Sequence, residues 1–597
     1  MQTLTSPAKC LLLCCTAFFL SVAPATSKER ADEIVASDLL PDSTILYAEI
    51  PRTKQLITTI FDHQITKDIQ ATNEYKAATS TEEYQQFRAG ITLFESVLGL
   101  KWRPAIESLS AGGLYFAFDP ETDAAALLMK SNDAELLENF RDTVIKLARL
   151  DAAGKARPDP LRQSEYRGVR VFRAGQARFA TVDKWLIVVN KDNLGKRIVD
   201  TYLDLKESKA DGNSLTNSTQ YQTARSSAGK DQTAWGYVNL EVIRNAGVAK
   251  TLFSGRTENA AVEILVGGVM DTLKNSPYAT ATLTAKPHQF GFAVSLPHKA
   301  EWVTETREYF FGENGRGAAS ALLRPKDTLL TLSTYRDLAA MWAGADDLYD
   351  ENAAAEIAKA DSNLSTLFAG RDFGNEILAA AGPELQFVLA RQSYEDADIP
   401  KPAIKLPAGA VVVSLVDPEV TRQFKVAFQS AIGLVNFGQG QNGSPQFELN
   451  SEKRGSGEIV SAVYLVDKGA QKDGEGLIQY NVSPTIAFVK DKLILSSANS
   501  LARKLMDLVK TDAAAATKDA PVNTQILADL QAIGTTLKDN QKHLVAQNML
   551  EKGHGKEAAE REIGRLLKIL DYVNDVSIRF TTEAENLQLN FEVNIKQ

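Results

Sequence analysis

The sequence predicts an α+β protein built from two tandem diverged repeats, each a mainly antiparallel sheet with packed helices. Three observations predict this fold class: a strand-to-helix segment occurs twice, apolar strands are separated by short turns, and helices with one apolar face follow them. Short turns between neighbouring strands favour antiparallel pairing, because a parallel sheet needs a long connection between its strands.

The duplicated segment occupies residues 180–200 and 487–507, which align without a gap at an offset of 307. Each copy runs through an apolar strand and reaches a polar residue that can cap a helix, Asp192 in the first and Asn499 in the second. Leu, Ile or Met then recur at helical intervals. This pattern indicates a shared scaffold and carries no chemistry.

Other blocks of the chain repeat in the same order. At an offset of 284, residues 39–46 match 323–330 and residues 126–140 match 410–424; at an offset of 297, residues 263–284 match 560–581. The second copy therefore has additional residues, and we expect its Gly-, Gln- and Ser-rich segments 436–445 and 454–457 to form a surface loop or hairpin tip. We assign the first repeat to residues 26–312 and the second to residues 313–597.

Period-2 and helical patterns predict the elements of the first repeat. Strands are expected at 44–50, 113–118, 125–130, 168–173, 178–182, 186–190, 234–240, 279–285 and 289–296, and helices at 82–98, 134–150, 194–205 and 258–274. Asp133 is an expected N-cap, and the apolar stripe that follows it favours packing on the sheet over a mobile lid. In the second repeat we expect a helical stretch at 524–568, broken at Gly553 and Gly555, and a closing hairpin at 576–595.

Residues 1–25 have the pattern of a signal peptide. Lys9 precedes an apolar run from Cys10 to Val22, and Ala23-Pro-Ala25 is typical of a cleavage site. The run is too short for a membrane span, and no later stretch reaches that length, so we expect no transmembrane anchor after cleavage. Leu-Leu-Leu before Cys14 lacks the small residues typical of a lipid-attachment site. We expect export to the periplasm or the extracellular space.

The three cysteines, Cys10, Cys14 and Cys15, all lie in this segment, so the mature chain would be free of cysteine. This excludes cysteine nucleophiles, zinc–thiolate sites and iron–sulfur clusters. Removal of Lys9 would leave 65 Lys and Arg against 75 Asp and Glu, a net charge near −10. An acidic chain argues against nucleic acid or an anionic membrane as partner.

Motifs for nucleotides and nucleophiles are weak. Gly438–Gly443 matches G-x-G-x-x-G, yet a helical pattern precedes it and Pro445 follows it, whereas phosphate binding needs a strand before and a helix after. Ser227–Lys230 matches S-x-x-K without the companion motifs of penicillin-recognising enzymes, so a solvated helix end is favoured. We expect no cofactor.

No pattern selects a metal site or a catalytic pair. The five histidines, His63, His288, His298, His543 and His554, lack ligand spacing and are expected at the surface. The acidic runs 346–351 and 395–398 lack the order of a calcium loop and are expected to be solvated turns. The sequence therefore assigns no catalytic, cofactor-binding or metal-binding residue, although two distant carboxylates of a glycosidase would leave no local pattern.

The segment Leu39–Tyr47 reads Leu-Leu-Pro-Asp-Ser-Thr-Ile-Leu-Tyr, and repeated strand-to-helix units follow it in a cysteine-poor chain. In these features the chain resembles secreted bacterial proteins assigned to domains of unknown function. The resemblance implies a bacterial envelope or extracellular setting and no known activity. Our leading hypothesis is a non-enzymatic exported protein that binds a protein or small-molecule ligand through a sheet face or the groove between its domains. The alternatives are a carrier of an apolar ligand such as lipid and an envelope hydrolase whose site assembles only in the fold.

Overall fold

The computed structural model describes residues 34–596, apart from 210–211, 230, 248–249, 251–252, 254–255, 258–259, 316, 395–400, 466–477, 511–521 and 584. The expected signal peptide, the three cysteines and the acidic run 395–398 lie outside the described residues. Two compact units divide the chain. The first comprises residues up to 248 and 277–294, and the second comprises residues 249–276 and 295–597.

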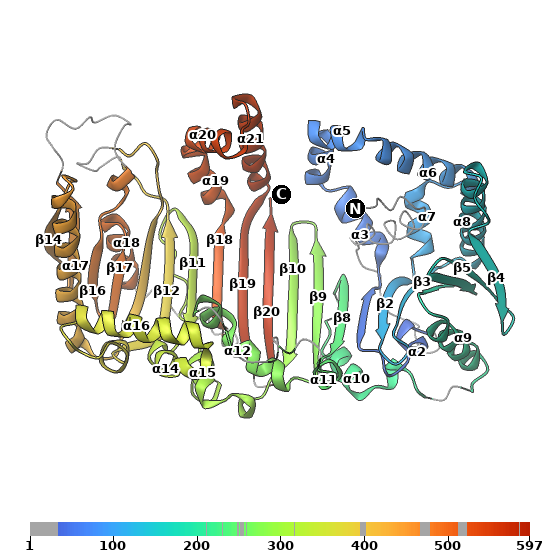
Figure 1. Ribbon diagram of the computed structural model, residues 1–597, viewed down its shortest axis with the longest axis horizontal. Helices are drawn as coiled ribbons and strands as arrows, with labels where there is room; N and C mark the ends of the chain where they lie inside the picture. The colour runs from blue at the N-terminus through green and yellow to red at the C-terminus, as the bar shows by residue number, and fades with distance from the viewer. Residues whose placement is uncertain are drawn as a thin grey trace. The chain divides into compact units, whose positions relative to one another are not determined.

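The first unit contains an antiparallel sheet, of which Figure 1 labels β2 to β5 and β8 to β10. Its order is β4 (Leu161–Tyr166), β5 (Val169–Ala174), β6 (Ala177–Val182), β7 (Trp185–Val189), β3 (Ala124–Lys130), β2 (Gly113–Asp119), β1 (Leu46–Ile50), β8 (Ala234–Asn239) and β9 (Tyr278–Lys286). Strand β9 pairs in turn with β10 (Gln289–Pro297).

The second unit contains an antiparallel sheet with the same connectivity. Its order is β14 (Phe447–Arg454), β15 (Gly457–Tyr464), β16 (Thr485–Val489), β17 (Lys492–Ser496), β13 (Ala408–Leu415), β12 (Ala381–Ala390), β11 (Thr328–Tyr335), β18 (Val522–Asp529), β19 (Val573–Glu583) and β20 (Asn586–Ile595). The predicted α+β class with antiparallel pairing is therefore confirmed.

One face of each sheet is buried under helices. In the first unit, α9 (Asp192–Lys206), α2 (Ala36–Leu39) and α10 (Thr219–Ser226) pack with strand residues such as Ile187 in one core. In the second unit, α18 (Asn499–Lys510) packs with residues such as Ile494. The strand positions correspond, because Ala180 lies opposite Ile187 and Ala487 lies opposite Ile494.

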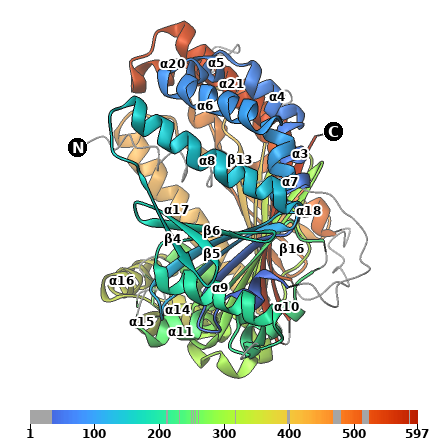
Figure 2. The same ribbon diagram turned by 90° about the vertical axis from the view of Figure 1, so that its right-hand side faces the viewer.

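The other face of each sheet carries a long helix at one end. Helix α8 (Ala134–Gly154) contacts β4, β6 and β7 (Figure 2). It buries Leu137 and Ile145. The expectation that its apolar stripe packs on the sheet is confirmed, and Asp133 caps it by accepting a hydrogen bond from the Leu136 amide. Helix α17 (Thr421–Gln441) contacts β14 and β16 in the second unit.

Most predicted elements of the first unit agree with the structure to within a few residues. The strand β4 was not predicted, because its sequence LRQSEY is almost entirely exposed and has no apolar alternation. Helix α6 (Glu82–Leu98) has the predicted bounds. The sequence did not predict several short helices of this unit, among them α3 (Thr53–Phe61), α4 (Gln64–Ala71), α5 (Asn73–Thr79), α7 (Trp102–Leu109) and α11 (Leu240–Asn245).

The predicted helical stretch at 524–568 is partly wrong, since it begins as strand β18 and becomes helical only at α19 (Leu530–Asp539). The segment is a strand because it pairs with β11 on one side and β19 on the other, and Asp529 caps the helix that follows. Helices α20 (Gln541–Lys552) and α21 (Lys556–Asp571) complete the stretch, and the predicted break is confirmed at Gly553, whose φ is +65°.

Further helices of the second unit are α12 (Ala260–Asn275), α13 (Glu308–Phe311), α14 (Leu338–Ala343), α15 (Ala345–Leu348) and α16 (Glu351–Leu367). Within the part of the chain that the structure describes, every helix is too short or too polar to cross a membrane.

Candidate functional site

The predicted loop at 436–445 is partly wrong, because α17 continues through Gly438 and Gly440 to Gln441 and only residues 442–445 lie outside the helix. The segment 454–457 does form a hairpin tip, with Arg454 opposite Gly457. Of the S-x-x-K motif, Ser227 lies at the C-terminus of α10 and donates a hydrogen bond to the Thr223 carbonyl at 3.3 Å, while Lys230 lies outside the described residues.

The expectation of surface histidines holds for His288, His543 and His554 but fails for His298, which is buried and stacks on Phe311. The Nδ1 atom of His298 lies 2.9 Å from the hydroxyl of Thr272 on α12, and burial lowers the pKa of its imidazole. His63 caps α4. His554 lies near the surface, 3.4 Å from Glu562.

The acidic run 346–351 is also more ordered than a solvated turn. Asp346 and Asp347 form the first turn of α15, and Asp350 caps α16 by accepting from the Ala353 amide at 2.8 Å. Tyr349 between them is buried. Among the residues that the structure describes, no group of three or more His, Cys, Asp or Glu side chains is arranged to hold a metal ion.

One side of the sheet in the second unit carries apolar residues on several neighbouring strands, and we call it the apolar face. Its members alternate along each strand with residues of the opposite face, and each is half-buried or exposed. They are Leu495 of β17, Val411 and Val413 of β13, Leu385, Phe387 and Leu389 of β12, Leu330 and Leu332 of β11, Ile526 of β18, Val576 and Ile578 of β19, and Leu589, Phe591 and Val593 of β20.

Strand register places the centre of this face in one continuous row. Each residue lies directly opposite the next: Leu495, Val411, Phe387, Leu332, Ile526, Ile578 and Phe591. Directly opposite residues of an antiparallel pair project to the same side of the sheet. The row therefore crosses seven strands without a polar side chain, and Leu495 and Phe591 at its ends are 40% and 38% exposed.

Helices border the apolar face. Helix α17 packs its Phe424 and Phe428 with strand residues beyond Leu495, such as Ile486. Helix α19 contacts β11 and β19, and Phe310 of α13 packs edge-on against Phe580 of β19 with ring centroids 5.5 Å apart. The centre of the face has only partial cover, which is unusual because monomeric proteins rarely expose large contiguous apolar surface.

The corresponding row of the first unit has a different composition. It runs through Val188, Leu127, Phe116, Ala48, Gly236 and Ala281. Three strands that carry Leu or Ile in the second unit thus carry Ala or Gly here. The row of the first unit offers less apolar surface to a ligand.

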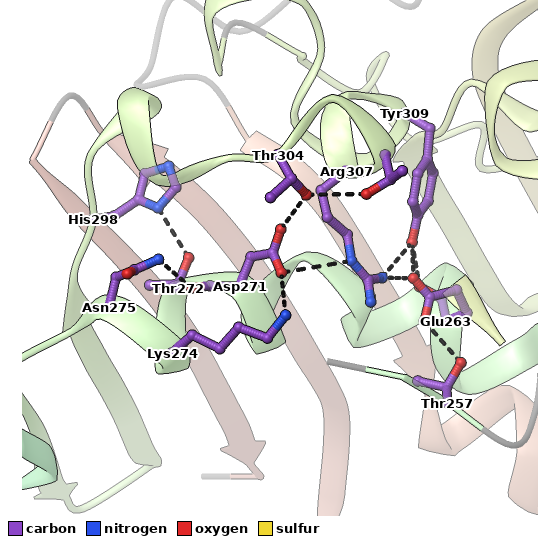
Figure 3. Close-up of polar contacts among 11 residues, drawn as sticks. Thr257, Glu263, Asp271, Thr272, Lys274, Asn275, His298, Thr304, Arg307 and Tyr309 are labelled. Carbon is purple, nitrogen blue, oxygen red and sulfur yellow. Dashed lines mark hydrogen bonds and ion pairs between the residues drawn. The ribbon is translucent and has the colours of Figure 1, made fainter. Parts of the chain in front are cut away.

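Beside the apolar face, α12 and the segment before β11 enclose a cluster of buried charges (Figure 3). Arg307 forms an ion pair with Glu263 of α12, and the side chains of both are at most 2% exposed. Glu263 also accepts hydrogen bonds from Tyr309 and, at 2.8 Å, from Thr257. Burial raises the pKa of Tyr309 and lowers that of Arg307.

A second carboxylate, Asp271, lies two turns further along α12. It accepts a hydrogen bond from Thr304 at 2.7 Å and pairs with Lys274 at 3.3 Å, while Arg307 Nε lies 3.9 Å away (Figure 3). These contacts fasten α12 to the segment that leads into β11. Arg307, Glu263 and Asp271 are almost completely buried, whereas Lys274 at the edge of the cluster is partly exposed.

Arg336, which follows β11, is completely buried, and its guanidinium donates to neutral oxygens. Its guanidinium donates to the carbonyls of Ile264 and Tyr335, to Asn523 at 2.7 Å and to Thr524 at 3.1 Å. The ring of Phe310 lies 3.5 Å from the guanidinium carbon. Sequence analysis missed Arg336 and the apolar face, because the contacts that define them join segments far apart in the chain.

Comparison with known proteins adds little. No protein-family model matches the chain. No curated protein matches it either. Solved structures of TP0453 are distantly similar to 44% of this chain. The match to crystal form I includes 79% of the TP0453 chain, with 10% sequence identity and a TM-score of 0.24. The match to crystal form IV includes 81% of the TP0453 chain, with 11% sequence identity and a TM-score of 0.23.

Proposed function

We propose that this chain is an exported, non-enzymatic binding protein whose apolar face takes an apolar ligand such as a lipid chain. The observation that carries the proposal is the unbroken apolar row from Leu495 to Phe591. A ligand methylene that leaves water on such a surface contributes about 0.8 kcal/mol. Ten such groups would contribute on the order of 8 kcal/mol before the entropic costs of binding are subtracted.

We also propose that the chain consists of two tandem diverged repeats, at 26–312 and 313–597. The two units share one strand connectivity, and the offsets found in the sequence recur in the strand pairing. Ala126 lies opposite Val189 in the first unit, and Ala410 lies opposite Ser496 in the second. Ala410 is 284 residues after Ala126, and Ser496 is 307 residues after Val189. Because the rows of the two units differ in composition, we assign ligand binding to the second repeat.

Export to the periplasm or the extracellular space remains part of the proposal and rests on the composition of residues 1–25. An exported protein that binds an apolar compound would carry it through an aqueous space. The groove between domains that the sequence hypothesis included is not needed, since the apolar face lies within one unit.

The first test is native mass spectrometry of protein purified from its own host, followed by denaturing extraction. We expect a bound mass that extracts as an apolar compound. A bare polypeptide that also takes up no fluorescent apolar probe would refute the proposal. A doubled mass that excludes the probe would assign the apolar face to contact with a second copy.

A variant pair locates the site. Ile526→Asn places a polar group in the middle of the row, and we expect it to lower the affinity for a fluorescent apolar probe at least tenfold. Phe116→Asn introduces the same polar group into the row of the first unit, on a strand that also carries an apolar side chain, and should alter affinity less than twofold. Equal effects of the two substitutions would contradict the assignment to the second unit. Thermal melts check that both variants fold.

A further inference from the structure

The apolar row of the second unit is long compared with a lipid chain. It crosses seven strands from Leu495 on β17 to Phe591 on β20. Neighbouring strands lie about 4.8 Å apart, so these two residues are separated by about 29 Å along the sheet. The row ends at Leu495 because Ile486, opposite it on β16, is buried and packs with Phe424 and Phe428 of α17. The hydrocarbon core of a bilayer is about 30 Å thick and is filled by two chains end to end, so one membrane acyl chain spans only about half of the row.

The borders of the apolar face set the direction in which a long ligand can lie. Two residues before Ile526 on β18, Thr524 is buried, and it lies opposite Phe580, which Phe310 of α13 covers edge-on. On the other side of Ile526, α19 begins at Leu530 and contacts β11 and β19. A chain that ran along β18 or β19 would meet one of these borders within a few residues of the row. A long chain therefore lies across the strands, along the row itself.

The composition and the twist of the row favour a flexible ligand. Its members are Leu, Val, Ile and Phe, whose side chains neither donate nor accept hydrogen bonds, so the row selects a ligand by shape and length. A sheet twists by about 20° per strand, so strands at the two ends of the row differ in direction by roughly 120°. A ligand in contact with the whole row has to follow this twist. A chain of single bonds can do so by changing its torsion angles, whereas a rigid fused-ring compound cannot.

We propose that the ligand of the apolar face is a flexible, linear hydrocarbon chain that is longer than a membrane acyl chain and lies across the strands from Leu495 to Phe591. This inference rests on the proposed function and names the class of its ligand. An extended chain advances about 1.2 Å per bond, so about 24 carbons cover the row. A chain on a sheet face buries about half of its surface, so each added methylene tightens binding about twofold, compared with about fourfold at full burial. The gain continues until the chain reaches both ends of the row.

The test is a series of uncharged linear alcohols, namely dodecanol, hexadecanol, eicosanol and tetracosanol, each delivered from cyclodextrin to displace a fluorescent apolar probe. We expect the affinity of the wild-type protein to rise about tenfold at each step as far as eicosanol, and tetracosanol to bind at least as tightly. An affinity that levels off at or before hexadecanol would overturn the inference and leave the proposed function intact. Binding of none of the alcohols would refute the proposed function as well. A rigid sterol that binds more tightly than tetracosanol would overturn the assignment to a flexible chain.

Substitutions at the two ends of the row test its length. Leu495→Asn and Phe591→Asn should each weaken the binding of tetracosanol at least threefold and change that of dodecanol less than twofold, because the shorter chain can occupy the other half of the row. Leu449→Asn is the control, because Leu449 is 40% exposed, as Leu495 is, and lies on β14 outside the row. Unchanged binding of tetracosanol in both end variants would overturn the inference. If either variant fails to fold, the series of alcohols on the wild-type protein decides.

Discussion

Arg307 and Glu263 form an ion pair that is almost completely shielded from water. Removing one partner of such a pair leaves the other charge buried, which costs about 3–5 kcal/mol. We therefore expect Arg307→Met to lower the melting temperature of the second unit strongly, while the double variant Glu263→Gln, Arg307→Met recovers part of the loss. Differential scanning calorimetry of the wild type and the variants measures the effect. A double variant as unstable as the single one would contradict a charge-based explanation.

The pH dependence of stability should contain a contribution from His298. Burial lowers the pKa of its imidazole in the folded state, so folding favours the neutral form. The associated stability is complete above the unfolded pKa of about 6.5 and is lost as the pH falls below it. We expect the melting temperature to decline between pH 7 and pH 5. His298→Gln should decline less steeply, and an unchanged slope in the variant would contradict the prediction.

Two glycines in helices should respond oppositely to alanine. A Cβ at Gly268 of α12 would lie 2.4 Å from the ring of Phe310, whereas a Cβ at Gly433 of α17 would have open space around it. Gly268→Ala should destabilise the protein, since overpacking costs about 1–3 kcal/mol. Gly433→Ala should stabilise it by up to about 1 kcal/mol through helix propensity. Urea unfolding of both variants measures the difference, and a neutral Gly268→Ala would show that Phe310 is free to shift.

The exposed side of α17 should tolerate polar residues. Leu434 and Phe437 are 69% and 68% exposed, so their replacement removes little buried surface. We expect Leu434→Gln and Phe437→Gln to change the free energy of unfolding by less than about 0.5 kcal/mol. Sedimentation velocity should show the same species as the wild type. A large destabilisation together with a smaller sedimentation coefficient would reveal that another copy covers this side.

Local patterns in the sequence were sufficient for elements with a clear period. Helix α8 begins directly after its predicted cap Asp133, and the duplicated segment becomes β6, β7 and α9 in one unit and β16, β17 and α18 in the other. These elements follow from capping and from apolar spacing within a few residues, which a sequence displays directly.

Tertiary contacts decided the elements that local patterns misrepresent. Strand β18 was predicted to be helical and is a strand because it fills the position between β11 and β19. Gly438 and Gly440 were predicted to lie in a loop and are helical, in a turn of α17 whose Asn436 and Gln439 donate hydrogen bonds to β14 and β15. In each case the surroundings outweigh an intrinsic preference of less than about 1 kcal/mol per residue.

The sequence by itself determined the α+β class of the fold and the antiparallel pairing of its strands, and it displays no recognisable motif for catalysis or metals. The tertiary structure alone decided which side of each sheet is covered, and so which alternating residues form the apolar face. The tertiary structure also brings Arg336, which follows β11, into contact with Phe310 and Thr524. A period of two shows that a strand has two unlike sides, but helices from distant parts of the chain determine which side meets water.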